Sequence, residues 1–297
     1  MPIRLDAIRV EDKAFVISGR FIKTAALKNE WQEDIDNPNR VIRELKDSPG
    51  KIDLLRFWQR IPESEPKYSY YHEWRDVAAI AISDYKHWFE KQISPKARNK
   101  VRKSAKFGVA IEQTELTDEL VRGIMDIFNQ SPVRRGKRFW HYGKDFETVE
   151  KEMSLDLNES IFVTAYYKGE LIGFVKLLFA DRYALLTVIL DRLNHRDKAP
   201  MNGMIAKAVE ICAARKVPYL GYYMWRRAGH REFQESTGFE RISIPEYFVP
   251  LTLKGTIALR LGLHRGEKGL IPEKVMGWLL MFRARWYAAK YSRRPAE

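Results

Sequence analysis

The pattern of hydrophobic and polar positions is clearest between residues 161 and 239. Three strand-like runs come first, at 161–167, 171–179 and 183–190, and they are rich in β-branched, aromatic and other apolar residues. A short turn, Lys168-Gly169-Glu170, separates the first two runs and predicts a hairpin. The third run is almost continuously apolar, which is typical of a strand covered on both faces. We therefore expect a hairpin followed by a central strand.

A polar loop, residues 192–200, follows Asp191 at the end of the third run and leads into a helix. From Met201 the apolar residues recur at helical spacing, at Ile205, Ala208, Val209 and Cys212. The first turn of a helix has unpaired backbone N–H groups and the positive end of the helix dipole, so it attracts anions. Arg196 and Lys198 add positive charge just before it. The junction is therefore a predicted seat for phosphate or pyrophosphate.

The remaining elements of this region are a strand and a helix. The strand is predicted at 219–225 and the helix from about Gly229 to Ser236. Gly238 follows the helix and can adopt the left-handed conformation that ends helices. The region therefore ends in a helix closed by Gly238-Phe239.

The order of these elements resembles the GNAT acyltransferase superfamily, and in detail its Fem-type branch. That branch contains the aminoacyltransferases that build peptidoglycan interpeptide bridges, and it often has a basic segment like residues 97–108 ahead of the catalytic half. The resemblance covers roughly residues 95–250. It implies an α/β (α+β) fold with a mixed, mainly antiparallel central sheet flanked by helices. It also implies a reduced N-terminal lobe (1–92, a diverged or truncated GNAT-like half) and an acyltransferase domain (93–252), and the charge of the remaining residues marks a basic C-terminal tail (253–297).

The resemblance further implies an N-acyltransferase that uses acetyl-CoA or another acyl-CoA to acylate a primary amine of a small molecule or cell-envelope precursor. The residues at the donor positions are Leu190, Arg196, Lys198, Met201, Asn202 and Gly203. Two departures from the family pattern leave alternatives open. Arg196 to Met201 keeps only part of the pyrophosphate motif, and Gln234 stands where many members have a Tyr acid. The alternatives are a Fem-type enzyme that uses aminoacyl-tRNA and a non-catalytic binding scaffold.

In such an enzyme a neutral amine attacks the donor carbonyl directly. Backbone N–H groups at residues 187–190 are the predicted donors to the oxyanion. Asp191, at the end of the central strand, is the predicted base that acts through water. Tyr223 and His230 are the weaker candidates for returning the proton. A turn or cap role for Asp191 is the structural alternative.

Two basic segments are candidates for substrate binding. Ser94, Pro95 and Gly108 bound a predicted helix, in which Arg98, Arg102 and Lys106 recur at every fourth position and so share one face. That face suits RNA phosphates, a nucleotide-linked substrate or a lipid headgroup, and a solvated face is the alternative.

The second segment is the loop 131–143, with Arg134, Arg135, Lys137, Arg138, Trp140, His141 and Tyr142. Its cations suit carboxylate or phosphate, and Trp140 and Tyr142 suit a sugar or base, unless Phe139 and Trp140 only anchor it to the core.

Composition and charge bear on where the protein is located in the cell and on a further binding surface near the C-terminus. The chain has 297 residues and a net charge of +13, and residues 254–297 contribute ten Lys or Arg against three Glu. A predicted amphipathic helix at 272–291 suits an anionic membrane surface or a nucleic acid, or else packs on the catalytic domain. The single cysteine and the lack of a signal-like start favour the cytoplasm, with peripheral contact at the inner membrane face as an option. The scattered histidines predict no metal site.

The first 92 residues show weaker patterns. Strands are predicted at 14–18 and 77–82, and helices at 21–30, 40–46 and 52–60. These elements are the basis for expecting a reduced companion lobe.

Overall fold

The computed structural model describes residues 7–48, 50–134, 136–225 and 230–265, which form two compact units. Unit 1 contains the described residues up to Asp76 and those from Ile242 onward, and unit 2 contains those from Val77 to Arg241. The division falls within two long strands, β5 (His72–Ala81) and β13 (Glu240–Pro250). Each unit has its own hydrophobic core.

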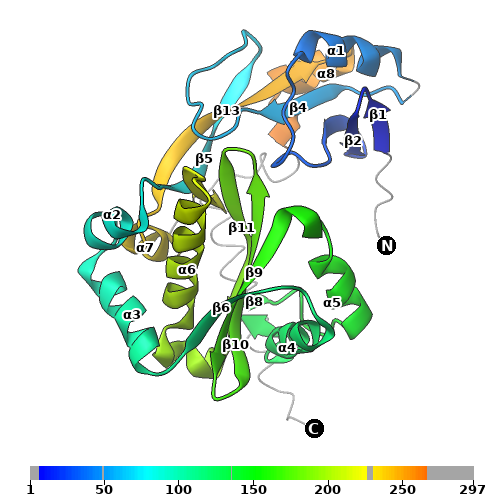
Figure 1. Cartoon of the computed structure of the whole chain (residues 1–297). Coiled ribbons are helices and arrows are strands. Elements are labelled where there is room, and N and C mark those ends of the chain that lie inside the picture. Colours follow the sequence, from blue (N-terminus) through cyan, green and yellow to red (C-terminus); the bar gives the residue numbers. More distant parts are fainter. Residues whose placement is uncertain (1–6, 49, 135, 226–229, 266–297) are drawn as a thin grey trace. The chain divides into compact units, whose positions relative to one another are not determined.

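Unit 1 is built on a sheet with helices beside it (Figure 1). The strand order is β1 (Ala7–Val10), β2 (Lys13–Ser18), β3 (Thr24–Leu27), β4 (Leu54–Trp58) and β13. β3 and β4 are parallel, and the other neighbours are antiparallel. Its helical elements are α1 (Pro38–Asp47), α8 (Leu253–Arg260) and the 3-10 turn Leu263–Arg265.

The predictions for the N-terminal residues are partly confirmed. The strands at 14–18 and 77–82 and the helix at 40–46 are present as β2, β5 and α1. The helices predicted at 21–30 and 52–60 are wrong, because these segments contain β3 and β4. Leu54, Leu55, Phe57 and Trp58 are all buried, so β4 has no polar alternation to mark it as a strand.

A buried carboxylate fastens α8 to the rest of unit 1. Asp53 is 4% exposed and accepts hydrogen bonds of 2.9 Å from the Lys23 N–H and the Thr252 hydroxyl. Burial raises the pKa of Asp53, but these donors and the Lys254 ammonium outweigh it and hold the pKa below its usual value. A Cβ atom at Gly255 would lie 1.9 Å from the Asp53 carbonyl oxygen. Glycine is therefore required for α8 to pack against Asp53.

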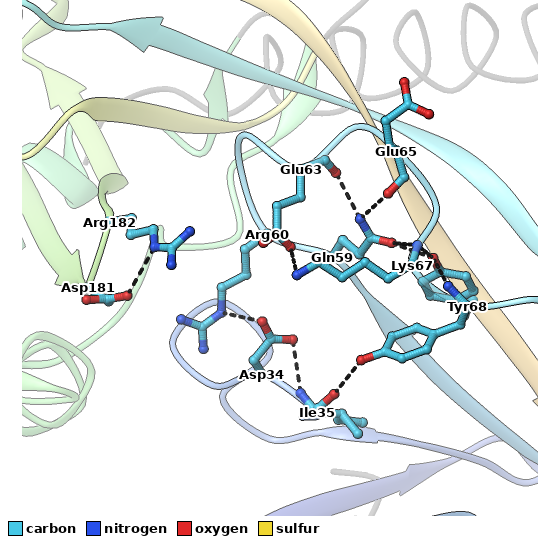
Figure 2. A network of polar contacts seen from close by, with 11 residues as sticks. Asp34, Ile35, Gln59, Arg60, Glu63, Glu65, Lys67, Tyr68, Asp181 and Arg182 are labelled. Atoms are coloured by element: carbon cyan, nitrogen blue, oxygen red, sulfur yellow. Dashed lines mark hydrogen bonds and ion pairs between the residues drawn. The ribbon is translucent and has the colours of Figure 1, made fainter. Parts of the chain in front are cut away.

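The loop between β4 and β5 is held by one buried amide (Figure 2). Gln59 Nε2 donates to the carbonyl oxygens of Glu63 and Glu65 at 3.2 and 2.8 Å, and Gln59 Oε1 accepts from the Lys67 N–H at 2.8 Å and from the Tyr247 hydroxyl. Beside it lies a polar pocket of about 190 Å³. Its lining residues are Asp34, Ile35, Asp36, Phe57, Trp58, Gln59, Glu63, Lys67 and Tyr68.

Unit 2 contains the elements on which the resemblance rests. Its strand order is β5, β12 (Tyr219–Met224), β11 (Tyr183–Asp191), β10 (Glu170–Ala180), β9 (Ser160–Tyr167) and β6 (Ala110–Thr114). β11 and β12 are parallel, and the other printed neighbours are antiparallel. The predicted hairpin is confirmed, since Tyr167 pairs with Glu170 across Lys168 and Gly169, which both have positive φ. The predicted central position of β11 is confirmed as well.

Helices cover both faces of this sheet (Figure 1). On one face α6 (Pro200–Ala214) packs on β9, β10 and β11, and α3 (Pro95–Lys106) packs on α6. On the other face α4 (Asp118–Asn129) and α5 (Phe146–Met153) enclose a second cluster that contains Phe128, Phe162 and Phe174. Cys212 lies on the buried side of α6, and burial raises the pKa of its thiol to about 12. The fold class predicted from sequence, a mainly antiparallel sheet flanked by helices, is confirmed.

The helix caps predicted for unit 2 are present in the structure. Ser94 accepts from the Ala97 N–H at 3.1 Å, and Gly108 follows α3 with φ +75°. Gly238 follows α7 with φ +87°, and the Phe239 N–H bonds to the Gln234 carbonyl oxygen at 2.9 Å. The short elements are α2 (Tyr85–His87), β7 (Val133–Arg134), β8 (Lys137–Arg138), α7 (His230–Ser236), the π-helical turn Trp88–Gln92, and the 3-10 turns Leu157–Glu159 and Leu193–Lys198.

Candidate active site

The centre of unit 2 is the place where β11 separates from β12. Their parallel pairing runs from Tyr183 and Tyr219 to Leu185 and Gly221, although β11 continues to Asp191 and β12 to Met224. Within the described ranges, no further pair joins these two strands. Beyond Leu185, alternate backbone groups of β11 therefore have no strand partner on that side.

A β-bulge in β11 lies at the same place. Leu186 pairs with Leu177 of β10 and Val188 pairs with Lys176, so Thr187 is an extra residue. Its hydroxyl donates to the Lys176 carbonyl oxygen at 3.1 Å. A bulge interrupts the regular ladder and redirects the backbone groups beside it. The bulge falls within residues 187–190, where the sequence predicts the oxyanion donors.

Asp191 lies at the end of β11 and contacts a predicted donor-binding residue. Its side chain is 7% exposed, and Oδ1 accepts from Arg196 Nε at 3.1 Å. Its backbone oxygen accepts from Arg134 Nη1 at 3.0 Å. The structure therefore brings together three residues from separate predicted groups. Tyr223 lies in β12 and His230 is the first residue of α7.

The predicted donor loop is only partly open to solvent. Arg196 is exposed, Lys198 is half-buried and pairs with Asp197 at 3.2 Å, and Met201 is half-buried. Leu190 is half-buried against the cluster under α4. Asn202 and Gly203 are buried, and a Cβ atom at Gly203 would lie 2.9 Å from Ser104 Oγ of α3. This glycine therefore allows α6 to pack closely on α3.

The start of α6 has few free donors of its own. Ala199 precedes the helix with φ +53°, and Pro200 has no N–H group. The N–H groups of Asn202 and Gly203 bond to the Ala199 carbonyl oxygen at 3.2 and 3.4 Å. A phosphate at this position would therefore depend mainly on the side chains of Arg196 and Lys198.

Gln234, at the position of the family's Tyr acid, is fully buried. Its Nε2 donates to the Met224 carbonyl oxygen at 3.3 Å. This contact joins α7 to the end of β12. In this chain Gln234 therefore has a structural contact, between α7 and β12.

The predicted basic face of α3 divides into two parts. Arg98 donates to the carbonyl oxygens of Phe89, Glu90 and Ile93 at 2.9, 2.8 and 3.3 Å, so it fastens the π-helical turn. Arg102 and Lys106 are exposed and line a pocket of about 470 Å³. The other lining residues are Asn99, Lys103 and Phe107, which the sequence did not single out. In the sequence, the charge of Lys103 and the aromatic ring of Phe107, which is 42% exposed, were only general features of a basic helix.

The loop 131–143 is fastened to the core by Arg134 and His141. Arg134 Nη2 donates to the Ile127 carbonyl oxygen at 2.8 Å, and its guanidinium lies 4.7 Å from the Phe139 ring. His141 is 7% exposed, whereas Arg138, Trp140 and Tyr142 are exposed. Arg135 lies outside the described residues. The exposed members, Lys137, Arg138, Trp140 and Tyr142, are the ones that can meet a ligand.

A polar cluster that the sequence did not predict supports the predicted donor loop between β11 and α6. Arg192 Nε lies 3.2 Å from Glu170 and donates to the Leu171 carbonyl oxygen at 2.8 Å. His195 Nε2 lies 3.3 Å from Glu170. These contacts fasten the 3-10 turn after β11 to the start of β10. In sequence the residues are 20 or more positions apart, and nothing in the local pattern links them.

His141 provides a pH-dependent test of this packing. Burial, with help from Lys144 and Arg134, lowers the pKa of His141 to about 3. The folded chain then holds a neutral imidazole, while the unfolded chain binds a proton near pH 6.5. The contribution of His141 to stability is thus complete above pH 6.5 and is lost as the pH falls toward 3.

We expect the urea midpoint to fall between pH 6.5 and 5 in the parent chain, and this fall to become smaller in His141→Phe. Equilibrium unfolding at several pH values measures it. The same replacement at the exposed His87 is the control and should keep the parent's slope. Equal slopes in the parent and His141→Phe would contradict the assignment.

Comparisons with known proteins support the fold. No family model and no curated protein matches the sequence. Among solved structures, the C-terminal domain of a protein assigned as a lysylphosphatidylglycerol synthetase from Agrobacterium fabrum is similar with a TM-score of 0.60 and 12% identity, over 86% of each chain. FemX is similar with a TM-score of 0.58 and 9% identity, over 85% of this chain and 88% of FemX. L-PGS from Bacillus licheniformis has a TM-score of 0.54 and 12% identity, over 79% and 80%.

This chain has a GNAT-like fold of the Fem type. The resemblance seen in the sequence is thereby confirmed for the fold. All three features of the candidate site lie in unit 2. They are the separation of β11 from β12, the bulge at Thr187 and the loop before α6. Among the described residues no helix is long and apolar enough to span a bilayer, and none of their His, Cys, Asp and Glu side chains form a group of three able to hold a metal ion. The predicted C-terminal helix at 272–291 lies outside the described residues.

Proposed function

We propose that this chain is a GNAT-type N-acyltransferase that transfers an acyl group from an acyl-CoA to a primary amine of a small molecule or cell-envelope precursor. The observation that carries the proposal is the bulged β11, whose edge is left without a strand partner beyond Leu185. Such an edge offers fixed backbone donors to a carbonyl oxygen without the reorganisation that water requires. The GNAT-like fold of the similar structures supports the same reaction class.

The reaction is a single displacement at the acyl carbon. The amine nitrogen forms a bond to the carbonyl carbon, and the electron pair of the C=O bond moves to its oxygen beside residues 187–190. When the carbonyl forms again, the C–S bond breaks and the thiolate of coenzyme A leaves. The amine proton passes through water to Asp191, and the thiolate takes a proton from water. Preorganised donors of this kind contribute about 10²–10³ in rate for each donor.

The donor would lie with its pyrophosphate against the loop before α6. Arg196 and Lys198 supply the positive charge, and the dipole of the 15-residue helix α6 adds to it. Both side chains already have carboxylate partners, Asp191 at 3.1 Å and Asp197 at 3.2 Å. A bound pyrophosphate has to compete with these partners, so the affinity should depend on salt.

A calorimetric titration with acetyl-CoA at two salt concentrations tests the donor. We expect micromolar binding that the combined change Arg196→Ala and Lys198→Ala weakens by tenfold or more. The control combines Arg182→Ala and Lys207→Ala, which removes the same charge from other parts of unit 2. An unchanged affinity in the first variant would contradict the pyrophosphate site, and an absence of binding in the parent would contradict the acyl-CoA donor.

Transfer from aminoacyl-tRNA is the second candidate function, and two observations favour it. The similar structures include FemX and the C-terminal domain of a protein assigned as a lysylphosphatidylglycerol synthetase, a name that describes a product with a lysyl group. In addition, the start of α6 offers few backbone donors to a pyrophosphate, since Pro200 has no N–H group and the N–H groups of Asn202 and Gly203 bond to the Ala199 carbonyl oxygen. Steep salt-dependent binding of a non-hydrolysable aminoacyl-tRNA, without acetyl-CoA binding, would favour this function. Binding of neither donor would favour a scaffold without a donor site.

Three predictions about the rest of the chain and its location stay proposals. We propose that unit 1 is the diverged GNAT-like half, because the likeness covers 86% of the chain and thus extends beyond residues 77–241. The contact of residues 272–291 with an anionic membrane at the inner face, and the cytoplasmic location, are also kept as proposals.

A further inference from the structure

Trp140 is a large aromatic side chain that is exposed and yet fixed in place. It is 68% exposed. The Lys144 Nζ atom lies 3.6 Å from the centre of its ring, and the His141 ring centre lies 3.7 Å from it at an interplanar angle of 37°. Holding a side chain of this size in one conformation costs rotamer entropy, and these two contacts offset that cost.

Both contacts lie on the same face of the indole. Two groups that touch opposite faces of one ring are separated by roughly 7 Å, since each lies about 3.5 Å from the ring. Lys144 Nζ and His141 Nδ1 are only 3.2 Å apart. One face of Trp140 is therefore covered by Lys144 and His141, and the large exposed area belongs mainly to the other face.

The covered side is rigid and carries no net charge. Lys144 Nζ contacts the two Glu152 carboxylate oxygens at 2.6 and 2.7 Å, so its charge is compensated. His141 is neutral and packs 4.0 Å from the Phe128 ring in the core. The loop behind it is fixed by Asn129, which accepts from the Gly143 N–H at 2.7 Å and donates to the Lys144 carbonyl oxygen at 3.3 Å. The free face of Trp140 is thus a preorganised, uncharged platform.

We infer that this platform binds the ring of an amino-sugar acceptor. This inference rests on the proposed function, which requires a nucleophilic amine. Pyranose rings and nucleobases both stack on indole. The exocyclic amine of a nucleobase is conjugated with its ring and is a weak nucleophile, whereas the amine of an amino sugar has a free electron pair. The exposed Tyr142 and Arg138 of the same loop provide hydrogen-bonding groups for sugar hydroxyls.

The platform belongs to the part of unit 2 that carries the proposed reaction. Arg134, in the same loop, donates to the backbone oxygen of Asp191 at the end of β11. Phe128, which packs on His141, lies 6.0 Å from Phe174, and Phe174 pairs with Leu190 in the sheet. A ligand ring on Trp140 is therefore connected by rigid contacts to the strand that would hold the acyl carbonyl.

Binding of methyl β-glucosaminide to the full chain tests the inference without any donor. Saturation-transfer NMR and calorimetry would measure its affinity in the parent, Trp140→Ala and Trp140→Phe. We expect Trp140→Ala to lose about tenfold or more and Trp140→Phe to lose less, because phenyl keeps part of the stacking surface. Trp74→Ala is the control, since Trp74 is 55% exposed and lies in unit 1, and it should bind as the parent does.

Several results would overturn the inference. They are no binding of the glucosaminide, equal affinity in Trp140→Ala, or binding of uridine or tyrosine amide through Trp140 in place of the sugar. The failure of the proposed function looks different. Sugar binding through Trp140 without acyl transfer from either donor would remove the function and keep the platform, whereas transfer to an amine that is not a sugar, without sugar binding, would remove the platform and keep the function.

Discussion

Asp191→Asn is expected to lower the rate of acyl transfer by about 10²–10⁴ while it leaves donor affinity nearly unchanged. Asparagine keeps a side-chain oxygen that can accept from Arg196 Nε, as Asp191 Oδ1 does at 3.1 Å. It removes the carboxylate that would accept the amine proton through water. The loss should therefore appear in kcat and kcat/KM of the transfer assay, and the dissociation constant of acetyl-CoA should stay within a few-fold of the parent value.

Asp181→Asn is the matched control for this change. Asp181 lies in the turn between β10 and β11, its side chain is 77% exposed, and its φ of +41° is one that asparagine tolerates well. It should retain parent activity. Unchanged turnover in Asp191→Asn would limit Asp191 to orienting Arg196, and a loss of donor binding without a loss of kcat would point to the same role.

Gly255→Ala is expected to destabilise unit 1 by about 3 kcal/mol or more, the largest stability effect among our predictions. The added Cβ atom would lie 1.9 Å from the Asp53 carbonyl oxygen and 2.8 Å from its carbonyl carbon. These are backbone atoms, so no side-chain rotation relieves the clash, and α8 has to move away from Asp53. That movement would also disturb the hydrogen bond between Thr252 and Asp53.

Hydrogen exchange resolved by segment measures this effect within unit 1. We expect faster exchange in α8 and β4 of Gly255→Ala, together with a lower urea midpoint. Leu253→Ala on the same helix is the control, because Leu253 is 77% exposed and its truncation should change stability by no more than about 0.5 kcal/mol. Parent-like exchange in Gly255→Ala would show that α8 can shift at little cost.

The sequence predicted the fold of unit 2 well because its signals are local. The Lys168-Gly169 turn sets the register of β9 and β10, and Ser94 and Gly238 mark helix ends with their own side chain or backbone. The error at β4 has a different cause. Its pairing partner β13 begins more than 180 residues later, at Glu240, so the partner that makes this buried segment a strand is invisible in the local pattern.

The site was less predictable because residue type does not reveal which donors are already used. Arg98 and Arg134 were predicted to bind substrate from their charge, and the structure shows each of them donating to backbone carbonyl oxygens. The role of Trp140 as a binding platform could also be predicted only in part from the sequence. Its aromatic character is in the sequence, but its fixed position depends on Lys144, His141 and Glu152 meeting in space.

The burial of Cys212 has a practical consequence for these experiments. It is the one cysteine of the chain, and its thiol, with a pKa of about 12, forms almost no thiolate at neutral pH. Since the thiolate is the species that reacts with maleimides and disulfides, Cys212 should remain unmodified in the folded protein. A cysteine introduced at an exposed position such as Ser83 or Tyr142 would then be the single labelled site, so a fluorophore or spin probe can be attached without first removing a native thiol.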